Sequence, residues 1–187
     1  MKKFFTLFAM AMMALAFTSC EDEEIARTLE GTWKGEMYIS TSHSGRTYYS
    51  TYTEITFIRD YNSYSSGTGY WVDYYSNAPR DYVANHINWT VDNGNIYIRF
   101  IEEGTRIEIR DYHLNDNHFS GTLYDNGNYV DFDMYNVSHP SNYYNNYNWG
   151  YDYWDEYYYY SRTRGDADST KAAERPVRFV NPAMKNK

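Results

Sequence analysis

The sequence contains a single cysteine, Cys20, and a single long apolar run, from Phe4 to Phe17. One thiol cannot form a disulfide within the chain and cannot by itself build a thiolate metal site, so the fold must depend on core packing. The apolar run is shorter than the roughly 20 residues that a membrane-spanning helix needs. The run therefore does not predict a transmembrane helix.

Basic residues are scarce over most of the chain. Between Glu21 and Tyr160 there are 8 Lys and Arg residues against 22 Asp and Glu residues, whereas residues 161–187 carry 7 against 3. An acidic body repels the phosphates of nucleic acids and of anionic lipids, so we expect neither as a partner. The short basic tail is the exception, and we interpret it as solvated.

The N-terminus has the pattern of a secretory signal over residues 1–19, with Lys2 and Lys3 before the apolar run and small residues before Cys20. This boundary resembles the lipobox of bacterial lipoproteins, although Phe17 departs from the usual aliphatic residue. The resemblance implies a diacylglyceryl group on Cys20 that anchors the protein to the bacterial outer membrane. An ordinary signal peptide cut near Cys20 is the alternative.

The acidic quartet Glu21–Glu24 lies in the segment 20–28, which we interpret as a tether. It resembles the surface-export signal of lipoproteins in the Bacteroidetes group, which implies exposure on the cell surface. The alternative is a merely solvated charged tether on a protein retained in the periplasm.

Beyond the tether, apolar residues alternate with polar ones and no sustained helical period appears, which predicts an all-β domain. Turn pairs such as Asn93-Gly94 and Asn126-Gly127 separate the alternating runs. We expect about eight antiparallel strands between Thr32 and Val137, in an up-and-down order that closes into a barrel. The residues expected to point inward are Trp33, Met37, Ile39, Ile55, Phe57, Ile87, Trp89, Val91, Ile96, Ile98, Phe100, Ile107, Ile109, Phe119, Leu123, Val130, Phe132 and Met134.

Four short stretches of this region resemble lipocalin-like domains of bacterial lipoproteins. They are Leu29-Glu30-Gly31-Thr32-Trp33, Ile55-Thr56-Phe57, the run from Trp89 to Ile98, and the run from Leu114 to Leu123. The resemblance covers residues 29–138 and implies that Trp33 plugs the closed end of the barrel; a generic core tryptophan is the alternative. It transfers no ligand and no catalytic residue.

The segment 139–160 is dominated by Tyr, Asn and Trp. Its flat aromatic faces suit stacking on sugar rings, while its amides suit sugar hydroxyls, so one interpretation is a glycan platform. The others are low-complexity sequence without a site, or a lid over the barrel mouth. The candidate ligand-binding residues are Tyr143, Tyr144, Tyr147, Trp149, Tyr151, Tyr153 and Trp154.

Residues 161–187 are expected to form a flexible tail. Within it, Asp168-Ser169-Thr170 resembles a bacterial O-glycosylation site, which leaves the modification of Ser169 open.

The sequence shows no catalytic or metal-binding constellation, so we expect no enzyme, no cofactor and no metal site. His113 and His118 are placed to face each other across a turn, but without a third ligand. We expect a binding module for a small apolar molecule or a glycan. The alternative is a structural or interaction lipoprotein with a side-chain-filled barrel that contacts a protein partner or the cell wall. Interior volume discriminates the two: the bulky inward residues favour a filled barrel, while Gly67, Gly69 and Gly121 would leave space.

Overall fold

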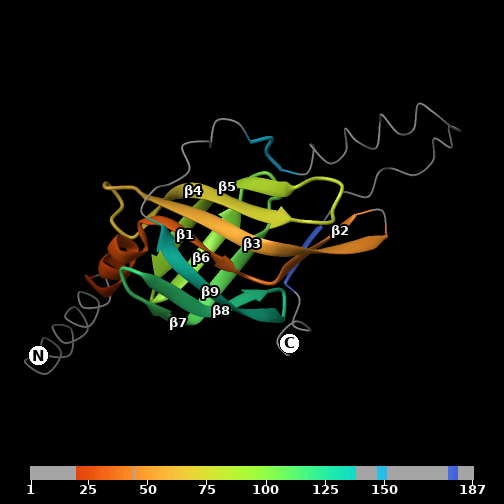
Figure 1. The fold of residues 1–187 in the computed structure, drawn as a ribbon. Coiled ribbons are helices and arrows are strands. Elements are labelled where there is room, and N and C mark those ends of the chain that lie inside the picture. Colours follow the sequence, from red (N-terminus) through yellow and green to blue (C-terminus); the bar gives the residue numbers. More distant parts are fainter. Residues whose placement is uncertain (1–19, 44, 138–146, 151–176, 181–187) are drawn as a thin grey trace, which may run out of the picture.

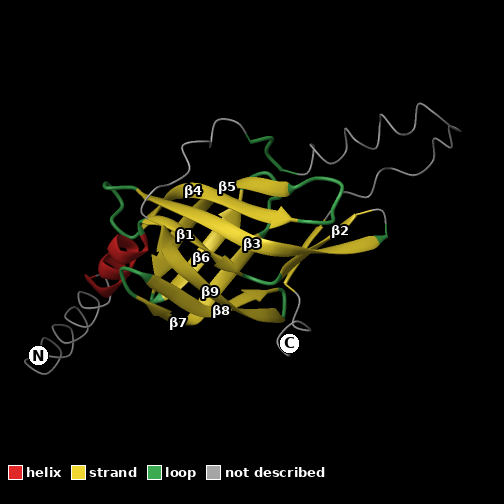
Figure 2. Cartoon of the chain, in the orientation of Figure 1, coloured by secondary structure: helices red, strands yellow, loops and turns green. Residues whose placement is uncertain are grey.

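The computed structural model describes residues 20–43, 45–137, 147–150 and 177–180, which form one helix over residues 20–29 and ten strands (Figures 1 and 2). The signal segment 1–19 lies outside the described residues. No helix within the described ranges has the length and apolar character needed to cross a membrane. The strands are β1 (Gly31–Glu36), β2 (Ile39–His43), β3 (Arg46–Arg59), β4 (Ser66–Tyr75), β5 (Tyr82–Asp92), β6 (Asn95–Phe100), β7 (Arg106–Leu114), β8 (His118–Asp125), β9 (Asn128–Val137) and β10 (Val177–Val180).

Eight of these strands close into an antiparallel barrel. Successive strands from β3 to β9 pair with one another, and β1 pairs with β9 on one side and with β3 on the other. Trp33 is thus opposite Asn136 of β9 and Ile55 of β3. The prediction of an all-β, up-and-down barrel is confirmed.

The alternation of Trp33, Gly35, Met37 and Ile39 with polar residues predicts one continuous first strand, but the structure splits it in two. Tyr38 has a φ of 46° and separates β1 from β2. The long β3 pairs with β1 through Thr53–Phe57 and with β2 through Arg46–Tyr49, so the hairpin of β2 and β3 extends beyond the barrel. The expectation of a single strand was wrong, because a left-handed residue bends the chain there.

The edge of β2 is covered by β10, which pairs with it in antiparallel register from Val177 to Val180. This differs from the flexible tail expected over residues 161–187. The physical reason is that β2 offers a row of unpaired backbone groups at the sheet edge, to which any extended segment can pair. The remainder of the tail, Ser169 included, lies outside the described residues.

The barrel interior is filled by side chains. Every residue expected to point inward is at most 4% exposed, and Trp71 joins them. A Cβ on Gly67 would lie 2.9 Å from the ring of Trp89, and a Cβ on Gly121 would lie 2.5 Å from Cβ of Tyr112. At Gly67 and Gly69 an added Cβ would also meet backbone carbonyl oxygens of β3, those of Ile58 and Thr56. The expectation that these glycines leave space is therefore wrong, because neighbouring backbone and side chains occupy it.

The segment expected as an acidic tether is a helix docked on one end of the barrel (Figure 2). Asp22, Ala26 and Leu29 are four and three residues apart and so lie on one helical face. Ala26 and Leu29 are fully buried, and both Asp22 carboxylate oxygens accept backbone N–H bonds, from Asn93 at 3.1 Å and from Gly94 at 2.8 Å. Residues 20–29 are thus a helix packed on the barrel and not a solvated tether.

The helix also contacts the residue expected as the barrel plug. Trp33 is fully buried, its Nε1–H donates to the carbonyl of Leu29 at 2.8 Å, and its ring meets Phe119 edge-on at 5.6 Å. Trp33 therefore lies at the end of the barrel where the helix docks.

Candidate functional site

The outer surface of β3, β4 and β5 carries a row of aromatic side chains. Alternation along these strands sends Trp71 and Asp73 inward and leaves Tyr70 and Tyr74 outside. Tyr52 of β3 stacks on Tyr74, with ring centroids 4.4 Å apart, and Tyr82 of β5 lies 6.5 Å from the same ring. We call the whole set the aromatic wall: Tyr52, Tyr70, Tyr74, Tyr82, His86, Tyr147 and Trp149.

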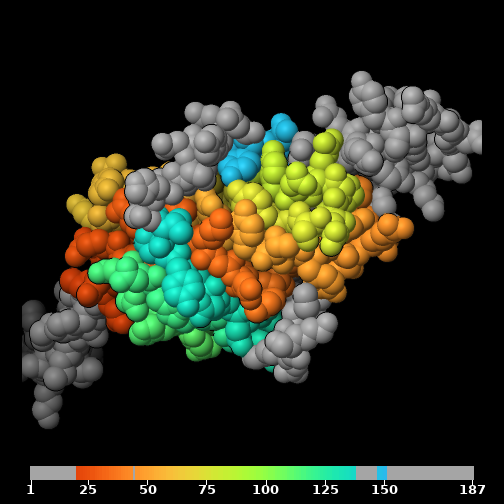
Figure 3. All heavy atoms as spheres, viewed as in Figure 1, coloured from red at the N-terminus to blue at the C-terminus, as the bar shows by residue number. Residues whose placement is uncertain are grey.

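Residues 147–150 join this surface by pairing with β5. Trp149 forms a parallel bridge with Ala84, and the N–H of Gly150 donates to the Ala84 carbonyl at 2.7 Å. Strand β6 pairs with β5 only from Ile87 onward, so the first half of β5 offers an edge to this segment. In the space-filling view, residues 147–150 lie against β4 and β5 (Figure 3).

The rings of this segment pack directly on the wall. Trp149 lies over His86 at 3.8 Å between centroids and stacks on Tyr70 at 5.5 Å. Tyr147 meets Tyr82 edge-on at 5.1 Å, and its hydroxyl bonds that of Tyr74 at 2.5 Å. Burial and this hydrogen bond raise the pKa of Tyr74 above its usual value, so its phenol stays uncharged at any physiological pH.

One acidic group borders the aromatic wall. Glu102 bonds both the ring Nδ1 of His86, at 2.5 Å, and the backbone N–H of His86, at 2.8 Å. These bonds fix the imidazole beneath Trp149. They also place a carboxylate, a hydrogen-bond acceptor, beside flat aromatic rings.

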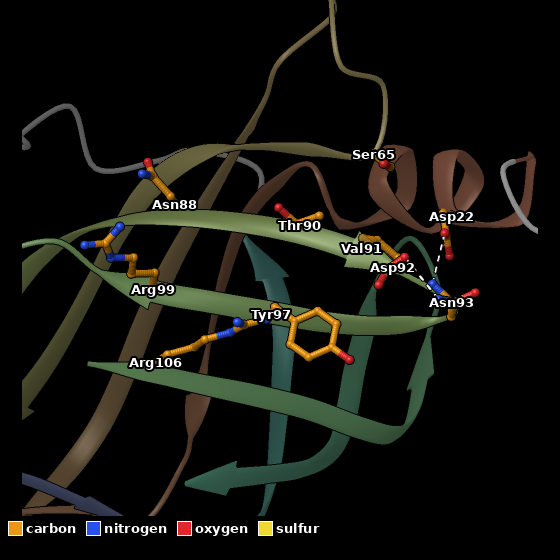
Figure 4. A pocket seen from close by; sticks show the side chains of 10 residues that line it. All are labelled: Asp22, Ser65, Asn88, Thr90, Val91, Asp92, Asn93, Tyr97, Arg99 and Arg106. Atoms are coloured by element: carbon orange, nitrogen blue, oxygen red, sulfur yellow. Dashed lines mark hydrogen bonds between the residues drawn. The ribbon is translucent and has the colours of Figure 1, made fainter. Parts of the chain in front are cut away.

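A polar groove of about 940 Å³ adjoins this surface on the outer face of β5, β6 and β7 (Figure 4). Asn88 and Thr90 of β5 lie two and four residues beyond His86, so the groove continues along the strand from the wall. Tyr97 lies in the middle, Arg99 and Arg106 lie toward one end, and the other end carries acidic and amide groups. The remaining lining residues are Asp22, Ser65, Val91, Asp92 and Asn93.

The barrel interior offers a different environment. Thr53 donates to Asp73 at 2.6 Å, and the indole N–H of Trp71 donates to the same carboxylate oxygen at 2.9 Å. Nearby, the Asn85 amide donates to Glu103 at 2.8 Å. Thr53, Trp71 and Asp73 bond one another inside the barrel and Asn85 bonds at its rim, so this region does not suit an apolar molecule.

Of the seven residues predicted as a ligand platform, the structure places Tyr147 and Trp149 together on the barrel wall. The predictions for the other five fall outside the described residues: Tyr143, Tyr144, Tyr151, Tyr153 and Trp154. The five wall residues on β3–β5 were not predicted from the sequence. The available signal was that Tyr70 and Tyr74 lie four residues apart in one strand, a spacing that sends both side chains to the same face.

His113 and His118 lie near each other on β7 and β8, on either side of the turn. The rings of His113 and His118 lie 6.5 Å apart, and Nε2 of His118 is 3.0 Å from a carboxylate oxygen of Asp133. Within the part of the chain that the structure describes, no three His, Cys, Asp or Glu residues gather as metal ligands.

Comparison with known protein families gives one finding. A family model described as a lipocalin-like domain matches residues 29–121, from just before β1 into β8. Comparisons with curated proteins and with solved structures gave no match.

Proposed function

Because residues 29–121 form a lipocalin-like domain, we propose that this protein is a non-catalytic binding module that holds a glycan on the outer wall of its barrel. The observation that carries the proposal is the aromatic wall, where rings from three strands and from residues 147–150 meet. Flat aromatic faces suit the apolar faces of sugar rings, and neighbouring polar groups suit the hydroxyls. Glu102 and Asn88 supply such groups beside the wall.

The packed interior supports an outer rather than an inner site. Small barrels either hold one ligand or are filled by their own side chains. Here Trp33, Trp71 and Trp89 are at most 1% exposed, and Trp71 packs edge-on against Phe100 at 5.2 Å. The proposal therefore takes the glycan, and not the small apolar molecule, as the ligand.

We further propose that a lipid on Cys20 anchors the protein to the outer membrane, with the barrel at the cell surface. Cys20 is exposed at the start of the docked helix, where an acylating enzyme can reach it. The two acyl chains of a diacylglyceryl group give stable anchoring, whereas one chain alone is marginal. Since the helix contacts the barrel directly, the anchor would hold the domain close to the membrane.

A second candidate function is a structural or interaction lipoprotein that contacts a protein partner or the cell wall. The observation that favours it is the stacking of Trp149 on Tyr70 and His86, because the segment then serves as internal packing. In that case the wall would bind no sugar.

Affinity electrophoresis against a panel of neutral polysaccharides separates the two functions. Tyr52 stacks on Tyr74 from a position outside the docked segment, so Tyr52→Ala tests the wall without undocking residues 147–150. We expect retardation of the wild type by at least one polysaccharide, weaker retardation of Tyr52→Ala, and no change in Tyr135→Ala, whose ring is 60% exposed on β9. Equal retardation of all three proteins would contradict a glycan site on the wall.

A further inference from the structure

Two arginines from neighbouring strands line the groove of Figure 4; the tip of Arg106 lies beside Tyr97, and that of Arg99 extends toward Asn88. Arg99 of β6 and Arg106 of β7 are direct partners in the antiparallel register, and both are exposed. Asn88 of β5 is the partner of Arg99 on its other side. The three side chains therefore form one row across three strands on the outer face of the barrel (Figure 4).

The two arginines differ from three others of the chain. Arg27, Arg59 and Arg110 each form an ion pair with a glutamate. By contrast, neither Arg99 nor Arg106 forms an ion pair with any residue in the described part of the chain. The pKa of the Glu108 carboxyl is nevertheless lowered by its hydrogen bond from Arg110 and also by the nearby charge of Arg106. Like charges directly opposite each other in a sheet destabilise it. Anions bound to these guanidinium groups would offset that repulsion.

The surroundings favour a planar anion attached to a polar molecule. The guanidinium of Arg106 lies over the Tyr97 ring, 4.6 Å from its centroid, which limits its orientations. A guanidinium presents its N–H groups as a fork that matches the two oxygens of a carboxylate. Asn88 adds an amide, and the Tyr97 ring forms the groove floor beside it.

The opposite end of the groove has the opposite character. Asp22 and Asp92 lie there with Asn93, and the Asp22 carboxylate is already engaged by the backbone N–H groups of Asn93 and Gly94 (Figure 4). Its negative charge disfavours an anion at that end. A bound molecule would therefore place its charged group on the arginines and neutral hydroxyls toward the aspartates.

We propose that Arg99 and Arg106 bind carboxylates of uronic acid units in an acidic glycan. The inference rests on the proposed function, because it extends the same glycan from the aromatic wall into the groove. His86 of the wall and Asn88 of the groove are two residues apart on one face of β5, a separation of about 7 Å along an extended strand. The groove volume of about 940 Å³ lies within the range of small-ligand sites.

Calorimetric titration of the full mature chain with an oligogalacturonide, and with the same oligomer after reduction of its carboxyl groups, tests the proposal. We expect the acidic oligomer to bind about 10- to 100-fold more tightly at low salt, since hydrogen bonds to charged groups are the strong ones. Arg99→Gln/Arg106→Gln should remove this preference. Arg46→Gln, which changes an exposed arginine on β3 outside the groove, should keep it.

Equal affinity of the wild type for the two oligomers, or an unchanged preference in the double variant, would overturn the proposal. Equal competition by inorganic phosphate and by galacturonate would do so as well, because the arginines would then bind any anion. Circular dichroism checks that both variants are folded. A different result is expected if only the aromatic wall does not bind glycan. Tyr52→Ala would then leave the affinities for the acidic and the reduced oligomer unchanged, and the preference for the acidic oligomer that depends on the arginines would persist.

Discussion

The indole of Trp149 lies on the imidazole of His86, with ring centroids 3.8 Å apart. The two residues are far apart in sequence, and their contact brings residues 147–150 onto the barrel wall. This relationship makes residues 147–150 part of the folded domain, whatever else the segment does.

We expect Trp149→Ala to lower the free energy of unfolding by about 1 to 2 kcal/mol, because stacked aromatic pairs contribute about 0.5 to 1.5 kcal/mol beyond their buried area. Urea unfolding followed by tryptophan fluorescence measures the change. The matched control is Tyr135→Ala, which removes an exposed ring and should stay within about 0.5 kcal/mol of the wild type. Equal stability of both variants would show that the docked segment adds nothing to the fold.

The barrel core gives a second prediction. Phe100 is fully buried and meets Trp71 edge-on, so Phe100→Ala should cost about 3 to 5 kcal/mol. Phe132→Ala should cost a similar amount, because Phe132 is 3% exposed and packs on Phe119 at 4.8 Å. Thr90→Ala, an exposed position on β5, is the control and should be nearly neutral. A loss below 1 kcal/mol for both phenylalanines would contradict a tightly filled interior.

Tyr112 predicts a loss of stability at alkaline pH. Its hydroxyl donates to the carbonyl of Gly94 at 2.8 Å, and burial, with the nearby Asp22 and Glu21 charges, raises its pKa from 10.0 to about 12. The folded state therefore holds the phenol proton after the unfolded state has lost it. The contribution of the protonated Tyr112 phenol to the free energy of unfolding is complete below pH 10 and disappears as the pH rises toward 12.

Thermal melts between pH 9 and pH 12 measure this effect. Tyr112→Phe should be less stable than the wild type at neutral pH by about 0.5 to 1.5 kcal/mol, the usual net contribution of one hydrogen bond. The difference between the two proteins should shrink as the pH rises. A constant difference over the whole range would show that Tyr112 does not titrate with a raised pKa.

If Cys20 carries a lipid, metabolic labelling of bacterial cells with palmitate should mark the wild type and leave Cys20→Ala unlabelled. Equal labelling of both would exclude Cys20 as the acylated residue. The thiol is exposed, so its replacement should leave the barrel intact, which circular dichroism verifies.

A test of the surface-export signal needs a variant that keeps Asp22, because this carboxylate accepts hydrogen bonds from the backbone of the turn between β5 and β6. Glu21→Gln/Glu23→Gln/Glu24→Gln removes three acidic charges and keeps that contact. If the acidic quartet directs export, this variant should change from protease-sensitive to protected in whole cells. Asp22→Asn is the comparison: it should lower thermal stability, and export defects seen only with it would point to folding rather than to the signal.

Alternation of apolar and polar residues was enough to predict the barrel and its interior. A strand sends successive side chains to opposite faces, so the choice of inward residues such as Ile98 and Phe100 depends on neighbouring positions alone. Turns are equally local: Asn93 and Gly94 have φ values of 50° and 74°, which Asn and Gly tolerate. These features could be derived without knowing which strands pair.

The outer surface depended on the tertiary structure. Tyr52, Tyr82 and Trp149 come from distant parts of the chain and meet only because of strand order and register. An outward tyrosine has the same local pattern whether it is isolated or part of a wall. The docking of Asp22 on a turn 71 residues away could not be predicted from sequence for the same reason, because the packing of the helix on the end of the barrel creates this contact. The pairing of Arg99 with Arg106 is more local, since it needs only the register of the hairpin between β6 and β7.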